Sequence, residues 1–352
     1  MSRVAALTGS LESRGIDGFL ISDLNNVRYL TGFTGSSGFL VITAGSRTFF
    51  TDSRYEEQAG GEVKGWRILI EREDRAKVIS DFVRASGIRT LGFEATASYA
   101  FYRSLLRKGF RLKAITNAVE ELRKIKDQTE VRSIQKAIQR AEKAFTAVKP
   151  RIRAGESEKR ISALLEENLK KAGCRTLPFD IIVASGPNSS MPHAKPTDRR
   201  LSPGDLVVID WGGEAEGYFS DMTRTLLING RSLSRKKEIY EIVLRANRTA
   251  INTAAGGAHA RAVDKAARDV ITEAGYGGHF GHGTGHGVGI EVHELPRVSR
   301  LGRERIKAGM VFTIEPGIYL PGTGGVRIED MVVARKDSCS VLTTLPKELE
   351  II

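Results

Sequence analysis

The sequence from Phe280 to Glu294 reads FGHGTGHGVGIEVHE and holds three of the chain's six histidines, His282, His286 and His293. Glycine has no Cβ, so the backbone here can pass close to a bound group. Imidazole is the commonest side-chain metal ligand and a proton carrier near neutral pH. The pattern predicts a turn that leads into a strand at Val288–Val292. Such a turn is either a site for chemistry or simply solvated.

Four carboxylates lie in or beside apolar, strand-like segments before and after this stretch. They are Asp210 in LVVID, Asp221 in DMTRTL, Glu315 in FTIEPGIY and Glu329 in GVRIEDMVVA. A hairpin would bring the two aspartates side by side, and Glu329 is expected inside a strand. Each carboxylate alone could be a turn, cap or edge residue. Together with one histidine they suit a pair of divalent cations such as Mn, Zn, Co or Fe, because burying unpaired carboxylates is costly.

The composition is that of a globular protein. The chain has 352 residues, of which 41% are hydrophobic and 27% charged, and no apolar run approaches the roughly 20 residues that span a bilayer. The N-terminus lacks the layout of a secretory signal. Cys174 and Cys339 are far apart and have no metal-type spacing, so we expect a reducing, cytoplasmic location.

The sequence disfavours two other classes of ligand, nucleic acids and dinucleotides. The net charge of +12 is compatible with a nucleic-acid groove or with a basic surface that keeps the protein soluble. Basic and acidic residues alternate throughout, without basic–aromatic repeats, so no nucleic-acid partner is expected. No placement within Gly281–Gly289 satisfies G-x-G-x-x-G, so a dinucleotide site is not supported.

The pattern of apolar residues predicts two domains. In residues 1–120, short strands alternate with helices, which predicts a small α/β domain with a mixed sheet. The expected elements are a helix at Val4–Ser13, strands at Gly18–Ile21, Phe39–Ile42, Thr48–Asp52 and Thr90–Phe93, a polar turn at Ser22–Asn26, and a helix at Lys77–Ser86. Nothing in this half resembles a catalytic set.

Residues 121–352 read as an α+β domain in which helices interleave with antiparallel hairpins. Helices are expected at Ala118–Lys149, Ile161–Ala172, Glu238–Ala255 and Ala262–Gly275. Strands are expected at Phe179–Ala184, Leu206–Trp211, Asp221–Leu227, Met310–Glu315 and Gly325–Ala334.

Four motifs in this second domain resemble, in order and spacing, those of the pita-bread (M24-type) metallopeptidases. They are DWGGEAEGYFSDMTRT, GHGTGHGVGIEVHE, TIEPGIY and GVRIEDMVV. That family includes Xaa-Pro aminopeptidases, Xaa-Pro dipeptidases (prolidases) and methionine aminopeptidases. The segments NVRYLTGFTGSSGFLVIT and TDSRYEEQA resemble the N-terminal domain of the proline-specific branch and of creatinase.

The resemblance implies a role for each site residue. Asp210 would bind one metal ion, Asp221 and Glu329 would bridge two, and His286 and Glu315 would complete the other. Glu315 would also be the general base that takes a proton from the bridging water. His193 and His293 would hold the substrate carbonyl and the tetrahedral intermediate, and His282 matches a further active-site histidine. Arg327 and Tyr319 match positions that orient the ligands. Arg297 is either a salt-bridge residue or the counterpart of an arginine that, in prolidases, contacts the substrate's C-terminal carboxylate.

The resemblance implies a manganese-type dinuclear peptidase, with Co or Zn as alternatives, that cleaves the bond between a first residue and a following proline. The leading prediction is an Xaa-Pro aminopeptidase acting on proline-containing peptides as a homodimer. The first alternative is an Xaa-Pro dipeptidase. Methionine aminopeptidases usually lack the large N-terminal domain, and creatinase works without the metal carboxylates. A binding module that has lost catalysis is disfavoured because all five ligands are present.

Overall fold

The computed structural model describes residues 3–352 of the chain. The chain forms two compact units, Met1–Arg123 and Lys124–Ile352, and each is described by itself. Within the described residues, no helix combines the length and the apolar character needed to cross a membrane.

Unit 1 is built on a mixed six-stranded sheet with the strand order β4-β3-β2-β1-β5-β6. The central strand β1 runs antiparallel to β2 and parallel to β5, as expected for a small α/β domain. Side chains of α4 pack on one face of this sheet through Ile79 and Val83. The bounds are β1 (Gly18–Ile21), β2 (Phe39–Thr43), β3 (Arg47–Asp52), β4 (Arg67–Glu71), β5 (Thr90–Glu94), β6 (Arg111–Ile115), α1 (Arg3–Thr8), α2 (Leu24–Thr31), α3 (Glu56–Glu62), α4 (Arg75–Ala85), α5 (Tyr99–Leu105) and α6 (Glu120–Arg123).

Two predictions for unit 1 differ from the structure. The helix expected at Val4–Ser13 ends already at Thr8. The polar turn expected at Ser22–Asn26 is instead the start of helix α2. The side chain of Asp23 accepts hydrogen bonds from the backbone N–H groups of Asn25 and Asn26. An aspartate at this position satisfies N–H groups that have no partner in the first helical turn, so polar residues that resemble a turn begin a helix.

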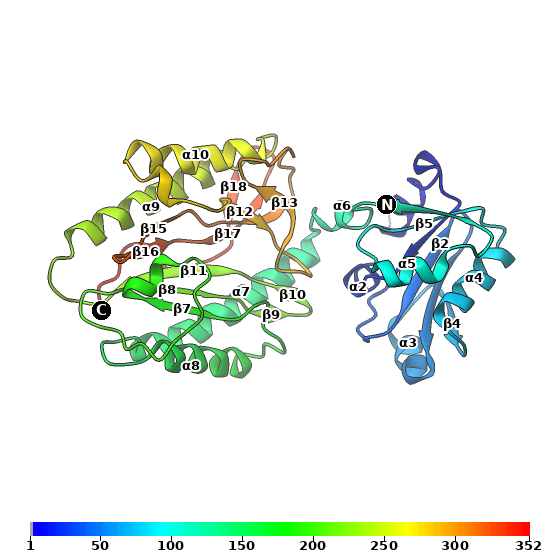
Figure 1. Cartoon of the computed structure of the whole chain (residues 1–352), viewed down its shortest axis with the longest axis horizontal. Coiled ribbons are helices and arrows are strands. Elements are labelled where there is room, and N and C mark those ends of the chain that lie inside the picture. The colour runs from blue at the N-terminus through cyan, green and yellow to red at the C-terminus, as the bar shows by residue number, and fades with distance from the viewer. Residues whose placement is uncertain (1–2) are drawn as a thin grey trace. The chain divides into compact units, whose positions relative to one another are not determined.

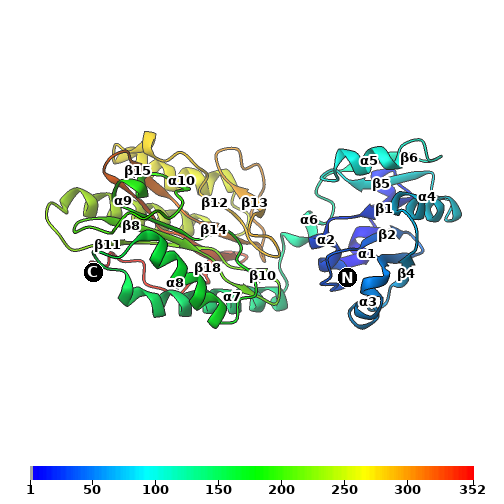
Figure 2. The ribbon, with the colours of Figure 1, turned by 60° about the horizontal axis from the view of Figure 1, so that its bottom comes forward.

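Unit 2 places its strands between two layers of helices, as Figures 1 and 2 show from two directions. Helices α7 (Gln128–Val148) and α8 (Glu158–Lys171) form one layer, and α9 (Ser234–Thr253) and α10 (Ala260–Glu273) form the other. The strands form a three-stranded sheet, β11-β8-β7, a five-stranded sheet, β13-β12-β14-β17-β18, and two short hairpins, β9-β10 and β15-β16. The bounds are β7 (Ile182–Ser185), β8 (Leu206–Trp211), β9 (Glu214–Ala215), β10 (Tyr218–Phe219), β11 (Met222–Leu227), β12 (Gly285–Gly287), β13 (Glu294–Val298), β14 (Val311–Ile314), β15 (Gly317–Leu320), β16 (Gly324–Arg327), β17 (Asp330–Ala334) and β18 (Cys339–Val341).

The central strands of unit 2 are apolar on both faces because a helix layer covers each face. In β14, Val311 joins the hydrophobic cluster that contains α7 and α8, whereas Phe312 joins the cluster that contains α9 and α10. Neighbouring residues of a strand point to opposite faces, so a strand between two layers reads as a continuous apolar run. This arrangement is the expected α+β architecture.

A helix and a strand of unit 2 differ from the predictions. The helix expected from Ala118 is interrupted after α6, and α7 begins only at Gln128. Asp127 caps α7 and forms a reciprocal capping box with Glu130, a pattern that marks a helix start. The strand expected at Val288–Val292 is a loop, and the glycine-rich residues before it form β12 instead.

Candidate metal centre and active site

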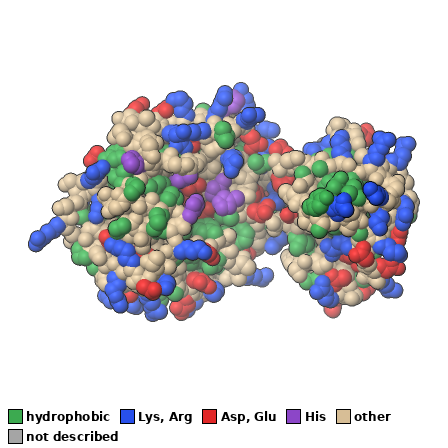
Figure 3. All heavy atoms as spheres, viewed as in Figure 1, with side chains coloured by type: hydrophobic (Ala, Val, Ile, Leu, Met, Phe, Trp, Pro, Cys, Tyr) green, Lys and Arg blue, Asp and Glu red, His purple; other side chains and the backbone are tan. Residues whose placement is uncertain are grey.

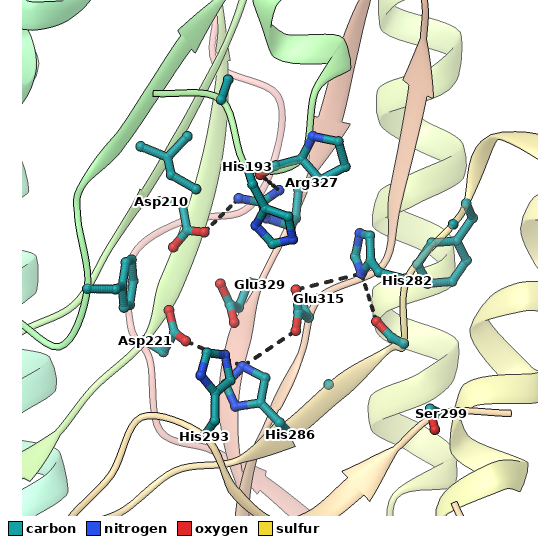
Figure 4. Close-up of a pocket in the computed structure, with 18 of the residues that line it drawn as sticks. His193, Asp210, Asp221, His282, His286, His293, Ser299, Glu315, Arg327 and Glu329 are labelled. Carbon is teal, nitrogen blue, oxygen red and sulfur yellow. Dashed lines mark hydrogen bonds and ion pairs between the residues drawn. The ribbon is translucent and has the colours of Figure 1, made fainter. Parts of the chain in front are cut away.

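All nine predicted catalytic and metal-binding residues line one cavity of about 1010 Å³ in unit 2. Histidine and acidic side chains gather on this face of the unit in Figure 3. Figure 4 shows carboxylates from several strands pointing toward one another, with histidines around them. The nine residues are His193, Asp210, Asp221, His282, His286, His293, Glu315, Arg327 and Glu329.

The two aspartates come from the antiparallel pair β8 and β11. Asp210 lies within β8, and Asp221 directly precedes β11. The register places Asp210 opposite Thr223 and Trp211 opposite Met222. The predicted hairpin arrangement is therefore present, and it delivers both carboxylates to the same end of the sheet.

The two glutamates lie in the break of a long hairpin. Strands β14 and β17 pair up to Ile314 and Asp330, and β15 and β16 resume the same register at Gly317 and Arg327. Glu315 and Glu329 therefore occupy opposite positions within the gap. The prediction that Glu329 lies inside a strand is wrong, because it falls between β16 and β17.

The ladder is incomplete there because Pro316 has no N–H to donate to the carbonyl of Ile328, although the N–H of Ile328 still reaches the carbonyl of Pro316 at 3.4 Å. The two glutamates form a pair whose N–H groups point outward, to neighbouring segments. The N–H of Glu315 donates to the carbonyl of Thr284 at 2.8 Å, and that of Glu329 donates to the carbonyl of Thr223 at 3.1 Å. Thr284 belongs to the histidine-rich turn and Thr223 to β11. These two bonds therefore tie the glutamate hairpin to the segments that carry the histidine and the aspartates.

His286 presents one ring nitrogen to the carboxylates. Its Nδ1–H donates to the carbonyl of Gly287 at 3.1 Å, which leaves the lone pair of Nε2 free. Nε2 lies 3.5 Å from Asp221 Oδ2 and 3.6 Å from Glu315 Oε1. Atoms that each lie about 2.1 Å from one cation are roughly 3 to 4 Å apart, so these distances fit ligands of a common ion.

The residues present fit a cation-binding site. Ligand atoms of Asp221, His286 and Glu329 lie within 4.8 Å of one another. Oδ1 of Asp210 and Oδ1 of Asp221 are buried and have no hydrogen-bond partner among the described residues. Buried carboxylate oxygens without partners are costly, and a divalent cation would remove that cost.

The electrostatics of the carboxylates lead to the same conclusion. Burial, followed by repulsion from Glu329 and Asp210, raises the pKa of Asp221 well above its usual value. Burial, followed by repulsion from Glu315, likewise raises the pKa of Glu329, and burial raises the pKa of Glu315 to about 8. Carboxylates held this close repel one another unless protons or cations intervene.

Arg327 connects three parts of the site. Its Nη2 donates to Asp210 Oδ2 at 2.6 Å, and its Nε donates to Thr223 Oγ1 at 3.0 Å. Thr223 in turn donates to Glu329 Oε2 at 2.8 Å. Nη1 bonds the carbonyl of Pro192 and the hydroxyl of Tyr319. The buried guanidinium therefore contacts Asp210 directly, Glu329 through Thr223, and the backbone directly before His193.

His282 is held by both ring nitrogens. Its Nδ1–H donates to the carbonyl of Gly283 at 2.8 Å, and its Nε2 accepts from the hydroxyl of Tyr319 at 2.8 Å. Burial, followed by the positive charge of Arg327, lowers the pKa of His282 to about 4. The imidazole is therefore neutral near pH 7, and Tyr319 links it to Arg327.

His193 and His293 are exposed to the cavity from opposite sides (Figure 4). The ring of His293 lies beside that of His286, with centroids 4.2 Å apart and planes tilted by 57°. His193 lies on the loop that joins β7 to β8. The part of the loop that carries His193 is bonded on both sides to the fully buried Glu158, which accepts the backbone N–H groups of Ser185 at 2.7 Å and Thr197 at 2.9 Å.

Sequence reasoning missed the residues that hold the histidine-rich turn. Asp264 Oδ1 accepts from the backbone N–H and the hydroxyl of Thr284. Arg268 pairs with Asp264 and donates to the carbonyls of Phe280 and His282. The only sequence signal was an acidic and a basic residue four positions apart on a helix, which is common on exposed faces as well.

Comparison with known proteins assigns the class of this fold and site. Residues 132–336 match metallopeptidase family M24, and residues 3–125 match the creatinase/prolidase N-terminal domain. The chain belongs to metallopeptidase family M24. Membership of this family implies divalent metal ions, and the cluster of carboxylates with His286 is the candidate site for them.

Several proteins named as Xaa-Pro dipeptidases or X-Pro aminopeptidases are similar to this chain over nearly its whole length. The Xaa-Pro dipeptidase of Pyrococcus horikoshii is 38% identical over 99% of this chain and 98% of its own. The structure of an Xaa-Pro dipeptidase from Bacillus anthracis has a TM-score of 0.96 at 38% identity and covers 99% of both chains. That of an X-Pro aminopeptidase from Thermotoga maritima has a TM-score of 0.90 at 38% identity and covers 100% of both chains.

Proposed function

We propose that this chain hydrolyses the peptide bond between a first residue and a following proline, as an Xaa-Pro aminopeptidase with two divalent metal ions. The observation that carries the proposal is the group of four largely buried carboxylates beside His286. Two of them, Asp210 and Asp221, each have a buried oxygen with no hydrogen-bond partner in the described part of the chain. The names of the similar dipeptidase and aminopeptidase support the choice of substrate.

Asp210, Asp221, His286, Glu315 and Glu329 would hold the metal pair. When bound, the two cations would supply Lewis acidity and lower the pKa of the attacking water. Glu315 would accept a proton from that water and donate it to the leaving proline nitrogen.

His193 and His293 would bind the substrate carbonyl oxygen and stabilise the charge that develops on it. Their exposure on either side of the carboxylates supports this assignment. His282 would contribute a neutral imidazole fixed by Tyr319, and Arg327 would orient the ligands. Residues 121–352 carry these functions in the proposal, and residues 1–120 form the creatinase-like domain.

One observation favours the dipeptidase as the second candidate. Arg297 lies on β13, lines the cavity and is exposed. Its guanidinium forms no hydrogen bond or ion pair with any residue in the described part of the chain. A free guanidinium in a substrate cavity suits the carboxylate at the end of a dipeptide.

Hydrolysis of Ala-Pro and Ala-Pro-Ala-Ala by chelator-treated protein, with and without added Mn²⁺, tests the proposal. Release of alanine from the longer peptide only with metal is expected for the aminopeptidase. Cleavage of Ala-Pro alone would transfer the assignment to the dipeptidase. Absence of cleavage with Mn²⁺, Co²⁺ and Zn²⁺ would refute both candidates.

Manganese is the proposed native metal because oxygen-rich sites with a single imidazole suit it. Activity and metal content of protein purified without added metal would test this choice. A cytoplasmic homodimer is part of the same proposal, and the mass of the particle in solution measured by light scattering would check the dimer.

A further inference from the structure

A buried amide lies at the break in the glutamate hairpin. Asn247 is on helix α9 and is completely inaccessible to solvent. Its Nδ2 donates to the carbonyl of Ile314 at 3.0 Å and to that of Ile328 at 3.3 Å. These two carbonyls belong to the residues directly before Glu315 and Glu329. One amide group therefore contacts the backbone on both sides of the gap.

The gap creates the need for such a group. The regular ladder stops at Ile314 because Pro316 has no N–H for the carbonyl of Ile328. One weak bond remains in the gap, from the N–H of Ile328 to the carbonyl of Pro316 at 3.4 Å. A buried carbonyl without a donor costs about 1 to 3 kcal/mol. The two N–H groups of a single carboxamide can serve two carbonyls at once, and those of Asn247 add a connection between the two strands where the ladder is incomplete.

The orientation of the amide is fixed from its other side. Oδ1 of Asn247 accepts a hydrogen bond from Lys347 Nζ at 2.9 Å, and the same Nζ pairs with Asp330 Oδ2 at 2.7 Å. If the amide were rotated by half a turn, its oxygen would face two carbonyl oxygens and its N–H groups would face an ammonium. Lys347 therefore keeps the N–H groups of Asn247 directed at the hairpin.

We propose that Asn247 is a positioning residue that sets the spacing between Glu315 and Glu329, and with it the affinity of the site for its metal pair. Asn247 does not touch the substrate or the reacting atoms. It acts on the backbone from which two ligands project, and small shifts of ligands weaken metal sites. The inference deepens the proposed function and rests on it.

The test is Mn²⁺ binding to metal-free protein by isothermal titration calorimetry. Asn247→Leu removes both donors at similar volume. Asn247→Asp keeps the shape and the contact with Lys347 but has no N–H to donate. We expect both variants to bind Mn²⁺ about 10- to 100-fold more weakly, the range seen when partners of metal ligands are lost. In the peptidase assay, kcat should fall while KM changes little.

Two matched controls lie on the same helix. Asn252→Asp changes an exposed asparagine of α9, and Ile239→Val slightly reduces its buried packing. Melting temperatures of the metal-free proteins place all variants on one stability scale. Lys347→Met frees the amide to rotate, so an intermediate loss of Mn²⁺ affinity is expected from it.

The outcomes separate the two proposals. Parental Mn²⁺ affinity in both Asn247 variants would overturn the positioning role. The same applies if Ile239→Val, at an equal melting temperature, loses as much affinity. A parental protein that binds no Mn²⁺, Co²⁺ or Zn²⁺ would instead refute the proposed function itself.

Discussion

Glu315 and Glu329 occupy directly opposite positions of one interrupted hairpin, with the same register on both sides of the gap. Like charges in opposite positions of an antiparallel pair destabilise it. Glu329 is buried and Glu315 is largely so, and burial raises the pKa of each. The local structure is therefore unfavourable for the ionised residues alone and favourable for the same residues around a cation.

This relationship predicts how the metal-free protein responds to pH. The pKa of Glu315 is raised from 4.5 to about 8, so the folded protein retains a proton that the unfolded chain has lost. The free energy of unfolding should therefore fall as pH rises from 6.5 to 8. His282 and His286, whose pKa values are lowered from 6.5 to about 4, oppose this trend below pH 6.5 and, with fading effect, up to about pH 7.5.

Thermal unfolding followed by circular dichroism at pH 6.5, 7.2 and 8, with chelator, checks this expectation. Added Mn²⁺ should raise the melting temperature most at pH 8, because metal ligands must be deprotonated. Glu315→Gln should flatten the pH dependence of the metal-free protein. A melting temperature that rises with pH in this window would contradict the account.

Arg327→Lys should reduce activity although the charge is kept. One ammonium cannot replace the guanidinium bonds to Asp210, Thr223, Pro192 and Tyr319. We expect a loss of about 10- to 100-fold in kcat/KM, with weaker Mn²⁺ binding. Arg248→Lys, at an exposed arginine that pairs with Glu348, is the control. Equal activity of the two variants would contradict the role of Arg327.

Glu158→Gln should loosen the loop that carries His193. The carboxylate accepts hydrogen bonds from residues on both sides of His193, including the backbone of Ser185 and Thr197, and an amide would present an N–H to some of these donors. The expected cost is about 1 to 3 kcal/mol of stability, measured by urea unfolding, with faster proteolysis of the loop. The exposed Glu167→Gln should change neither quantity.

Arg297→Ala should reduce kcat/KM more for a dipeptide than for a longer peptide. If the exposed guanidinium binds the terminal carboxylate of a dipeptide, kcat/KM for Ala-Pro should fall about tenfold or more, the effect of losing a charge-assisted hydrogen bond. The value for Ala-Pro-Ala-Ala should change less. Steady-state kinetics on both peptides gives the comparison. An equal loss of kcat/KM on both peptides would show that Arg297 does not determine the preferred length of the substrate.

The sequence predicts the strands of the site better than their surroundings. Strand β8 matches its prediction because an apolar run ending in Asp-Trp is visible locally. The strand expected at Val288–Val292 is absent, and the strand forms at Gly285–Gly287 instead, where the backbone passes close to that of Thr313. A Cβ on Gly285 would lie 1.9 Å from the carbonyl oxygen of Thr313, so glycine allows β12 to form at the residues GHG.

The supporting residues could not be predicted from local sequence. Asn247 contacts carbonyls 67 and 81 positions away. Arg327, which only the family resemblance indicated, contacts Asp210 across 117 positions. Such polar side chains resemble exposed helix or strand residues until the fold buries them. The candidate ligands were found because carboxylates beside apolar strands are unusual, whereas the groups that orient them carry no comparable signal.

The proposed ligands come from segments far apart along the chain, from Asp210 on β8 to Glu329 beyond β16. The unfolded chain does not hold these distant segments together, so ions shared among them would bind only the folded protein, and such binding stabilises the fold. Sequestering the metal would then do more than stop hydrolysis. The emptied protein would unfold and be degraded sooner, so metal supply would set the lifetime of the enzyme in the cell as well as its turnover.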